Sequence, residues 1–474
     1  MSDDPRSPLA PLQGVVAPLQ GVAAPPGAVP SPPQGAPCAI DFEGAPLRAF
    51  EGQSVAVALF AAGVRTLGRS TKYHRPRGAF CFEGHCASCL MRIDGKPNVR
   101  ACLTPARPDL RCERQNAFPS AEVDLLEAAD WLFPHGMDHH RLLTGNRAAN
   151  RLFVNLVRQV GGSGVLPDAP PASLPPVRDA RVDVCVVGAG PAGLAAAAEV
   201  GRTAPGTRVL VVDDQAVPGG SWLAEGGGAA RAADAAAQAS AAGAVLLARA
   251  VAIGFFPEDT VPAPPNVAGD HSAWLEGTLA VATPDGLVRV SARRILYATG
   301  GADQNVPFLD NDRPGVISAR ACGRLAFQHG VRPGKRVAVV GAAAFGDRLA
   351  EALAASGVAV ERVDATRERP LAAIGGANLR ALEVEDQAGV RRRLDADVIA
   401  AAATPAPASE LPRQHGARVA FDGHGGGFAV TVDGAFHTGV PGVFACGDVT
   451  GFQGPDAAAC AGAAAGREMA HTLR

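Results

Sequence analysis

The pattern of hydrophobic and polar positions changes three times along the chain. Residues 1–37 are rich in proline, glycine and alanine, and the segment Ala-Pro-Leu-Gln-Gly-Val occurs there twice, at 10–15 and 17–22. Large apolar residues follow neither the period of a strand nor that of a helix in this segment, so we expect a disordered tail.

From Cys38 the apolar positions alternate over short stretches that end in glycine, and Ser54 offers an N-cap for a short helix. Two strands, a helix and, after a cysteine-rich loop, a further strand are expected, at residues 39–44, 47–52, 55–63 and 90–93. This order of elements is typical of a small β-grasp domain.

From Arg181 strands and helices alternate, and the strands are almost continuously apolar, as expected when both faces of a parallel sheet are buried. Strand–helix–strand units begin at 182 and 336, and the pattern of the first unit returns at 442–448. One dinucleotide-binding domain interrupted by another explains this order. The predicted α/β organisation is a tail (1–37), a β-grasp domain (38–115), a helical connector (116–178) with helices at 121–132 and 147–160, a first dinucleotide-binding domain (179–305 with 402–474) and an inserted second one (306–401).

Composition and charge narrow the class of protein. A formal net charge of −2 over 474 residues gives no electrostatic reason to expect a nucleic-acid partner. The N-terminus lacks the pattern of a secretory signal, and no stretch is apolar for long enough to span a bilayer. Four of the ten cysteines lie within 81–102, at spacings that suit metal ligation better than disulfides. We therefore expect a cytoplasmic protein without an integral membrane segment.

The strongest chemical signal is a set of four closely spaced cysteines, Cys81, Cys86, Cys89 and Cys102. Their x4 and x2 opening matches the plant-type ferredoxin loop, in which four thiolates hold a [2Fe–2S] cluster. Gly78 and Gly84 would let the backbone bend closely and aim its N–H groups at the sulfurs. A redox dithiol would need no more than Cys86 and Cys89, and structural zinc would favour two CxxC-like pairs. These alternatives, and buried free thiols, explain less of the pattern.

A first glycine-rich turn lies between a predicted strand and a predicted helix. The residues of its dinucleotide-binding motif are Gly188, Gly190, Pro191, Ala192 and Gly193. Such glycines allow a tight turn, the approach of a pyrophosphate and close packing of the helix on the strand. Asp213, with Asp214 as the second candidate, follows at about the 20-residue spacing of a ribose ligand. FAD is favoured over NAD by further positions that two-dinucleotide flavoproteins place along the flavin, namely Gly219, Gly220, Gly300, Gly447 and Asp448.

A second glycine-rich turn, from Gly341 to Gly346, departs from the pattern at Ala343, whose methyl group would point towards a pyrophosphate. NAD(P) binding and a retained scaffold are both open at this turn. Asp364 ends the next strand as a ribose ligand would, which favours NAD. The preference over NADP is slight, because nearby arginines could meet a 2′-phosphate, namely Arg362 and Arg367.

Taken together, these motifs resemble the α subunit of heterotetrameric sarcosine oxidase. They also resemble related subunits of opine oxidases, dye-linked proline and hydroxyproline dehydrogenases, and hydrogen cyanide synthase. The resemblance covers roughly residues 38–474 and is most specific at 68–78, 133–138 and 311–315. It implies an N-terminal β-grasp ferredoxin-like domain followed by a glutathione-reductase-like fold with two dinucleotide-binding domains.

The resemblance implies an electron-transfer subunit of an amine or amino-acid oxidase or dehydrogenase. A partner subunit with its own FAD would oxidise a sarcosine-, proline- or opine-type substrate, and this chain would relay the electrons through flavin and cluster to an acceptor. Sarcosine oxidase α subunits continue into a folate-binding domain and tend to lack the cluster cysteines, whereas this chain stops at Arg474 and has all four. Both points favour a dye-linked amino-acid or opine dehydrogenase without folate chemistry. Cys446 and Cys460 alone cannot supply the additional C-terminal cysteine cluster of some relatives.

No residue stands out as a catalytic base for amine oxidation, because the histidines near the motifs are expected to be structural or close to the cluster: His74, His85, His135, His139 and His140. A rival hypothesis is a self-contained NAD(P)H-dependent reductase with FAD and [2Fe–2S], against which Ala343 argues. A third is an assembly scaffold with vestigial sites, against which the four cysteines argue.

Overall fold

The computed structural model describes residues 35–71, 73–128, 175–257, 275–376 and 378–473, and the single residues 146, 148, 151 and 173. Most of the predicted tail and connector, including the helix expected at 147–160, lies outside these residues. Of the helix expected at 121–132, the described part contains a 3-10 turn at Leu125–Glu127. Among the described residues, no helix combines the length and the apolar character needed to cross a bilayer.

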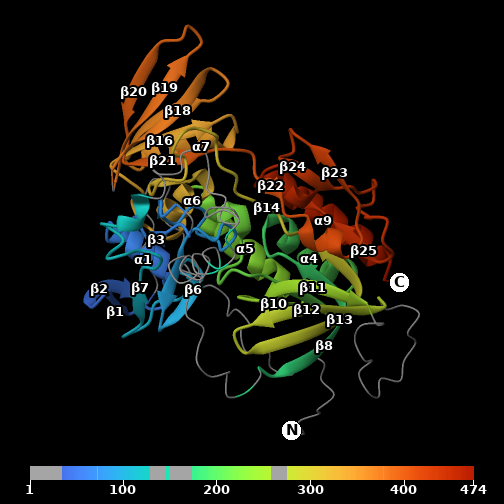
Figure 1. Cartoon of the computed structure of the whole chain (residues 1–474). Helices are drawn as coiled ribbons and strands as arrows, with labels where there is room; N and C mark the ends of the chain where they lie inside the picture. The colour runs from blue at the N-terminus through green and yellow to red at the C-terminus, as the bar shows by residue number, and fades with distance from the viewer. Residues whose placement is uncertain are drawn as a thin grey trace. The chain divides into compact units, whose positions relative to one another are not determined.

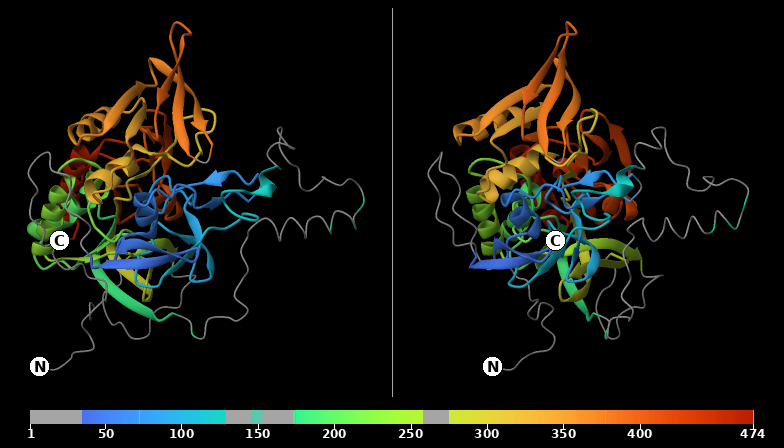
Figure 2. Two further views of the ribbon diagram at one scale, coloured as in Figure 1. Left: turned by 90° about the vertical axis from the view of Figure 1, so that its left-hand side faces the viewer. Right: turned by 60° about the vertical axis from the view of Figure 1, so that its left-hand side comes forward.

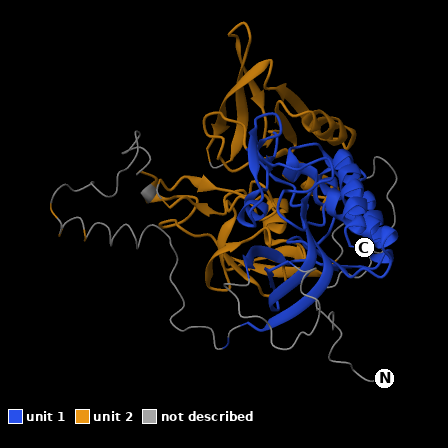
Figure 3. Cartoon of the chain, turned by 90° about the vertical axis from the view of Figure 1, so that its right-hand side faces the viewer, with its two compact units in different colours: residues 1–26, 171–304, 404–474 blue, residues 27–170, 305–403 orange. Residues whose placement is uncertain are grey.

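The chain forms two compact units, each discontinuous in sequence (Figure 3). The first comprises residues 1–26, 171–304 and 404–474, and the second comprises residues 27–170 and 305–403.

The first unit is built on a seven-stranded sheet in the order β10-β9-β8-β13-β12-β11, with β25 paired to β13 (Figure 1). From Val184 onward, alternate residues of β8 enter different cores, since Val184 and Val186 belong to one and Cys185 and Val187 to the other. Burial on both faces explains the continuous apolar pattern of this strand. The strands are β8 (Val177–Val187), β9 (Val209–Val212), β10 (Ala244–Leu247), β11 (Val251–Pro257), β12 (Gly277–Thr283), β13 (Gly286–Tyr297) and β25 (Val443–Ala445).

Two helices of the first unit, α4 (Pro191–Thr203) and α9 (Pro455–His471), lie directly on each other (Figure 1). A β-carbon at Gly462 would lie 2.0 Å from the carbonyl oxygen of Ala192, so glycine is required for this approach. The C-terminal helix is thereby packed beside the first glycine-rich turn. The remaining elements are α5 (Gly228–Ala241), α8 (Glu410–Gln414), β14 (Gly301–Ala302), β22 (Ala406–Pro407), β23 (Val419–Asp422), β24 (Gly427–Val430) and 3-10 helices at Gly220–Ala224 and Gly447–Thr450.

The second unit begins with a five-stranded sheet in the order β2-β1-β7-β5-β6, which is the expected β-grasp domain. The hairpin and the strand after the cysteine loop are confirmed. The helix α1 (Val55–Ala61) is capped by the hydroxyl of Ser54, which accepts from the N–H of Val57 at 3.3 Å. It is two residues shorter than expected, because Gly63 turns the chain with φ +88°. The strands are β1 (Pro37–Phe42), β2 (Ala45–Phe50), β3 (Gly68–Arg69), β4 (Pro76–Arg77), β5 (Leu90–Ile93), β6 (Lys96–Arg100) and β7 (Arg111–Glu113).

The second unit continues with a parallel sheet in the order β15-β21-β16-β17 and an antiparallel sheet, β18-β19-β20, whose long strands stand out in Figure 2. The parallel sheet contains the second strand–helix–strand unit predicted from the sequence. The elements are β15 (Val316–Ser318), α6 (Ala319–Gly323), a π-helical turn (Arg324–Gln328), β16 (Arg336–Gly341), α7 (Phe345–Ala355), β17 (Ala359–Asp364), β18 (Glu368–Gly375), β19 (Leu379–Asp386), β20 (Arg391–Asp395) and β21 (Val398–Ala401).

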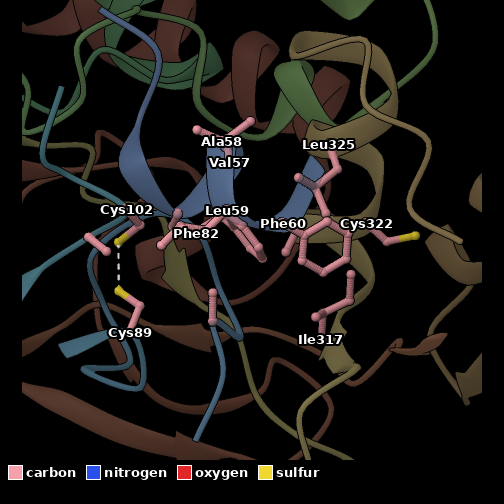
Figure 4. Close-up of a cluster of buried hydrophobic side chains, with 14 of the residues drawn as sticks. Val57, Ala58, Leu59, Phe60, Phe82, Cys89, Cys102, Ile317, Cys322 and Leu325 are labelled. Atoms are coloured by element: carbon pink, nitrogen blue, oxygen red, sulfur yellow. Dashed lines mark hydrogen bonds between the residues drawn. The ribbon is translucent and has the colours of Figure 1, made fainter. Parts of the chain in front are cut away.

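One hydrophobic core joins the β-grasp domain to residues 305–403 (Figure 4). Leu59 and Phe60 of α1 belong to the same buried cluster as Ile317 and Leu325. The rings of Phe60 and Phe82 meet edge to face, with centroids 5.5 Å apart. Because each large apolar side chain stabilises the fold by about 1.5–3 kcal/mol when buried, this shared core makes the two sequence segments one structural unit.

Candidate functional site

The four cysteines of the ferredoxin-like motif meet as two pairs. The Sγ atoms of Cys89 and Cys102 are 3.3 Å apart (Figure 4), and the thiol of Cys81 is hydrogen-bonded to Cys86. Within the described part of the chain, no three metal-binding side chains surround a single point as they would around one ion. Two thiol pairs fit a [2Fe–2S] cluster, in which each of the two irons takes two protein thiolates.

Within each pair, the contacts between the two thiols lower the pKa of one cysteine and raise the pKa of the other: those of Cys86 and Cys89 are lowered, and those of Cys81 and Cys102 are raised. The N–H of Glu83 donates to Cys81 Sγ at 3.4 Å, and that of Ser88 donates to Cys86 Sγ at 3.5 Å. The hydrogen bond from Cys81 lowers the pKa of Cys86 to about 5. A hydrogen bond from Cys102 likewise lowers the pKa of Cys89. Each pair thus contains one cysteine that ionises readily, and iron binds the thiolate form.

Two glycines near the cysteines, Gly78 and Gly84, are closely packed against neighbouring residues. Gly84 has φ +85°, and a β-carbon there would lie 2.6 Å from Leu103 Cδ1. A β-carbon at Gly78 would lie 2.5 Å from the carbonyl oxygen of Arg65. A larger residue at either position would collide with these neighbours and displace the loop.

Sequence reasoning missed a buried ion pair beside the cysteines. Glu83, two residues after Cys81, pairs with Arg324 of the π-helical turn. The side chains of Glu83 and Arg324 are 7% and 4% exposed. No local pattern could have identified this contact, because each residue lies in an unrelated stretch of sequence.

Two segments singled out by the family resemblance also meet next to the cysteine loop. Arg77, from 68–78, pairs with Asp312, from 311–315. The N–H of Ser318 donates to the carbonyl oxygen of Phe80 at 3.0 Å. These contacts and the buried ion pair fasten the cysteine loop to residues 305–403.

Of the candidate histidines near the loop, His74 has a buried polar partner on the segment that follows the β-grasp domain. His74 is buried, and its Nδ1 lies 2.9 Å from Asp124 Oδ2 and 3.0 Å from the carbonyl oxygen of Asn116. Its role is therefore structural, since it ties the segment after the β-grasp domain to the β3–β4 turn. His85 is exposed. The third group of candidates lies outside the described residues: His135, His139 and His140.

The first glycine-rich turn joins β8 to α4 and has space at one position. A β-carbon at Gly188 would lie 2.2 Å from the carbonyl oxygen of Ala298, and one at Gly193 would lie 1.8 Å from that of Gly188. By contrast, a β-carbon at Gly190 would meet only Gly220 Cα, at 3.8 Å. Gly188 and Gly193 are thus required by the fold, whereas Gly190 leaves room for an incoming group such as a pyrophosphate.

The other predicted flavin positions gather around this turn. Gly220 faces Gly190, and a β-carbon at Gly447 would lie 2.7 Å from that of Ala192. Asp448 is buried, and its Oδ1 accepts from the N–H groups of Gln453 at 2.9 Å and Gly454 at 3.2 Å. The aspartate thereby shapes the entry into α9. The remaining predicted positions lie on the adjoining loops, with Gly219 donating to the carbonyl oxygen of Ala189 at 2.8 Å and Gly300 following β13.

The two candidate ribose ligands have different surroundings. Asp213 Oδ2 accepts from the N–H of Ala189 at 2.6 Å, and its Oδ1 accepts from that of Gln215 at 2.9 Å. This carboxylate therefore holds the glycine-rich turn against the end of β9. Asp214 Oδ1 accepts from the side-chain amide of Gln215 at 2.9 Å.

At the second turn, Arg362 points into the protein's own backbone. Its Nη1 donates to the carbonyl oxygens of Gly341 at 2.8 Å and Val363 at 2.6 Å, and its Nε pairs with Asp347 at 2.7 Å. A β-carbon at Gly346 would lie 3.4 Å from the guanidinium carbon of Arg362. The guanidinium that the sequence offered to a 2′-phosphate is thus engaged within the turn.

The residues expected at the ribose end of the second turn lie near the surface. Hydrogen bonds from Thr366 lower the pKa of Asp364. The side chain of Arg367 is 81% exposed and lies 3.6 Å from Asp364. Ala343 is buried, with its N–H donating to the carbonyl oxygen of Ala402 at 3.2 Å.

Comparison with known proteins identifies the two kinds of domain in this chain. Residues 35–117 match the 2Fe-2S iron-sulfur cluster binding domain family, and residues 182–385 match the pyridine nucleotide-disulphide oxidoreductase family. A solved structure of L-proline dehydrogenase from P. horikoshii aligns with 92% of this chain and 73% of its own, with a TM-score of 0.66 and 20% identity. That chain and this one therefore share a fold.

Two relatives specify the family. Sarcosine oxidase subunit alpha of Rhizobium meliloti is 32% identical over 357 residues, which are 71% of this chain and 35% of that protein. Hydrogen cyanide synthase subunit HcnA of Pseudomonas aeruginosa is 41% identical over 88 residues, 18% of this chain and 84% of that one. This chain spans about a third of the length of the sarcosine oxidase alpha subunits it matches. The chain therefore belongs to the family of oxidoreductases that includes sarcosine oxidase alpha subunits, and its cofactors are a [2Fe–2S] cluster and FAD.

Proposed function

We propose that this chain is the electron-transfer subunit of a multi-subunit amino-acid or amine dehydrogenase. The observation that carries the proposal is the presence, in one chain, of two thiol pairs suited to two irons and a glycine-rich turn with space for a dinucleotide. The flavin would supply two-electron chemistry and the cluster would pass electrons one at a time.

Separate groups of residues would hold the cluster and the flavin. Cys81 with Cys86 would hold one iron, and Cys89 with Cys102 the other. The N–H groups at the start of α4 would face the FAD pyrophosphate, across the space at Gly190. Asp213 would bind the ribose hydroxyls, with Asp214 as the second candidate, because Asp213 contacts the glycine-rich turn and each carboxylate oxygen can accept a further hydrogen bond.

The substrate would be oxidised by another polypeptide. We expect an FAD-dependent, amine-oxidising partner subunit acting on a sarcosine-, proline- or opine-type substrate, and an electron acceptor that collects the electrons. The names of the relatives support this, since both are subunits of larger enzymes. The cytoplasm remains the expected compartment. NAD(P) binding at the second turn also remains a prediction, and the inward-facing Arg362 favours the relay over the self-contained reductase.

The isolated chain, loaded with both cofactors, is expected to oxidise no amino acid, because its chemical groups serve the cluster and the flavin rather than a carboxylate-binding substrate pocket. The assay is dye reduction with sarcosine, proline, hydroxyproline and opines, with and without a co-purifying flavoprotein subunit. Turnover should depend on that subunit. Robust turnover by this chain alone would refute the assignment as a relay subunit.

Replacing Gly190 by valine should weaken FAD binding without unfolding the protein. The added side chain has room in the fold but occupies the space left for the pyrophosphate, so affinity should fall about ten- to a hundredfold. Fluorescence titration of the apoprotein with FAD measures this. Gly193→Ala is the matched contrast: its β-carbon would strike the Gly188 carbonyl, so stability should fall as well. Unchanged FAD affinity in Gly190→Val would remove the pyrophosphate from this turn.

A further inference from the structure

An open hollow of about 470 Å³ lies beside the cysteine loop. Ala87, which stands between the ligand candidates Cys86 and Cys89, forms part of its wall. Leu90, Val99 and Leu103 add apolar surface. The polar lining residues are Asn98, Arg100 and Thr104.

Solvent reaches the cysteine loop on the side that faces the hollow. Ala87 is exposed and Cys86 is partly exposed, whereas Cys81, Cys89 and Cys102 are buried. Ala87 has φ +54°, a left-handed conformation that non-glycine residues seldom adopt. Such strained positions cluster at functional sites. An electron would therefore enter or leave the cluster over the shortest path at this edge.

The strand that borders the hollow carries cations without acidic partners. Lys96 and Arg100 are exposed on β6, an edge strand, and neither makes an ion pair within the described ranges. The neighbouring acids are already paired, since Asp94 binds Arg107 and Glu113 lies 3.9 Å from Arg92. Exposed positive charge thus remains at the rim of the hollow.

We propose that this hollow is the docking site of an acidic redox protein, the electron acceptor of the reduced cluster. An apolar centre with a charged rim is the usual anatomy of a small, transient electron-transfer interface. The charges at the rim select an acidic face on the partner and speed its approach. One electron passes from the reduced cluster to the oxidised centre of the partner, and no bond is made or broken. The inference rests on the proposed relay function.

The test uses one acceptor protein in two charge states. Native cytochrome c is basic, and succinylation of its lysines makes it acidic. The full chain, with cluster and FAD, is reduced with dithionite, freed of excess reductant and mixed with each form in a stopped-flow instrument. At low ionic strength the succinylated form should be reduced about tenfold faster than the native form, and added salt should abolish the difference.

Charge-reversal variants locate the surface. Arg100→Glu and Lys96→Glu should each lower the rate with succinylated cytochrome c about three- to tenfold and raise it with the native form. The matched control is Arg48→Glu on β2, because β2 and β6 are opposite edges of the same sheet and Arg48 is also exposed. This variant has the same net charge and should behave like the unmodified chain.

The results distinguish a failure of the docking proposal from a failure of the relay function. Equal slowing by Arg48→Glu, or no effect of Arg100→Glu and Lys96→Glu, would overturn the docking site and leave the relay function standing. The visible absorption of each preparation is recorded first. A chain that holds no cluster would overturn the relay function, and the docking proposal with it.

Discussion

Replacing Cys86 by serine is expected to reduce the iron content from about two atoms per chain to near zero and to abolish the visible absorption of the cluster. Cys86 has the thiolate favoured by Cys81 and by the N–H of Ser88, and it forms one half of a pair that would hold one iron. A serine hydroxyl ionises far less readily and is a poorer ligand for iron. Iron analysis and visible spectroscopy on protein purified without oxygen measure the loss.

Cys112→Ala is the matched control for this experiment. Cys112 is also a buried cysteine of the β-grasp domain, but it lies on β7, and burial raises the pKa of its thiol to about 12. This variant should keep the iron and the absorption. Stoichiometric zinc without iron, after expression with both metals available, would contradict the cluster assignment.

Replacing Arg324 by leucine should destabilise the second unit by about 3–5 kcal/mol, because it removes the positive charge that Arg324 places against the buried carboxylate of Glu83. The lost contact also holds the loop that carries Cys81, so the cluster should be released at a lower denaturant concentration. Urea unfolding followed by cluster absorption and by circular dichroism measures both effects.

A double variant tests whether the buried charge of Glu83 causes the loss of stability. Glu83→Leu together with Arg324→Leu removes both charges, so much of the lost stability should return. A more exposed pair of the same unit provides the comparison: the side chains of Arg369 and Glu385 are 70% and 17% exposed, and Arg369→Leu should shift stability much less than Arg324→Leu. If Arg324→Leu were as mild as Arg369→Leu, the buried pair would have no role in holding the cysteine loop.

Patterns in the local sequence were sufficient to predict the helices and strands of the β-grasp domain and the kinds of cofactor that the chain binds. The hairpin of β1 and β2, the capped helix α1 and the strand β5 follow from patterns within a few residues. The spacing of the four cysteines identified the iron–sulfur motif in the same way. The glycine-rich turn between β8 and α4 could also be predicted locally, because its glycines are required where the adjoining strand and helix pack closely.

The partners of individual side chains required the tertiary structure. The sequence placed four cysteines near one another, and the fold arranged them as two pairs. It also turned Asp213 towards the glycine-rich turn and Arg362 into its own backbone. Each case is decided by which polar group lies within hydrogen-bond distance, and spacing along the chain does not specify that distance.

The joining of the β-grasp domain to residues 305–403 is the largest feature that only the tertiary structure decided. Periodicity predicts that Phe60 and Leu325 will be buried, but it does not specify which residues they will contact, because the hydrophobic effect is not directional. The same holds for Glu83, whose charge requires a counter-charge without indicating where in the chain it lies. The sequence by itself determined the cluster motif and the first glycine-rich turn, because both depend on neighbouring residues. The support of the cluster loop was decided by contacts between segments far apart in the chain, since burial and charge pairing are satisfied in space.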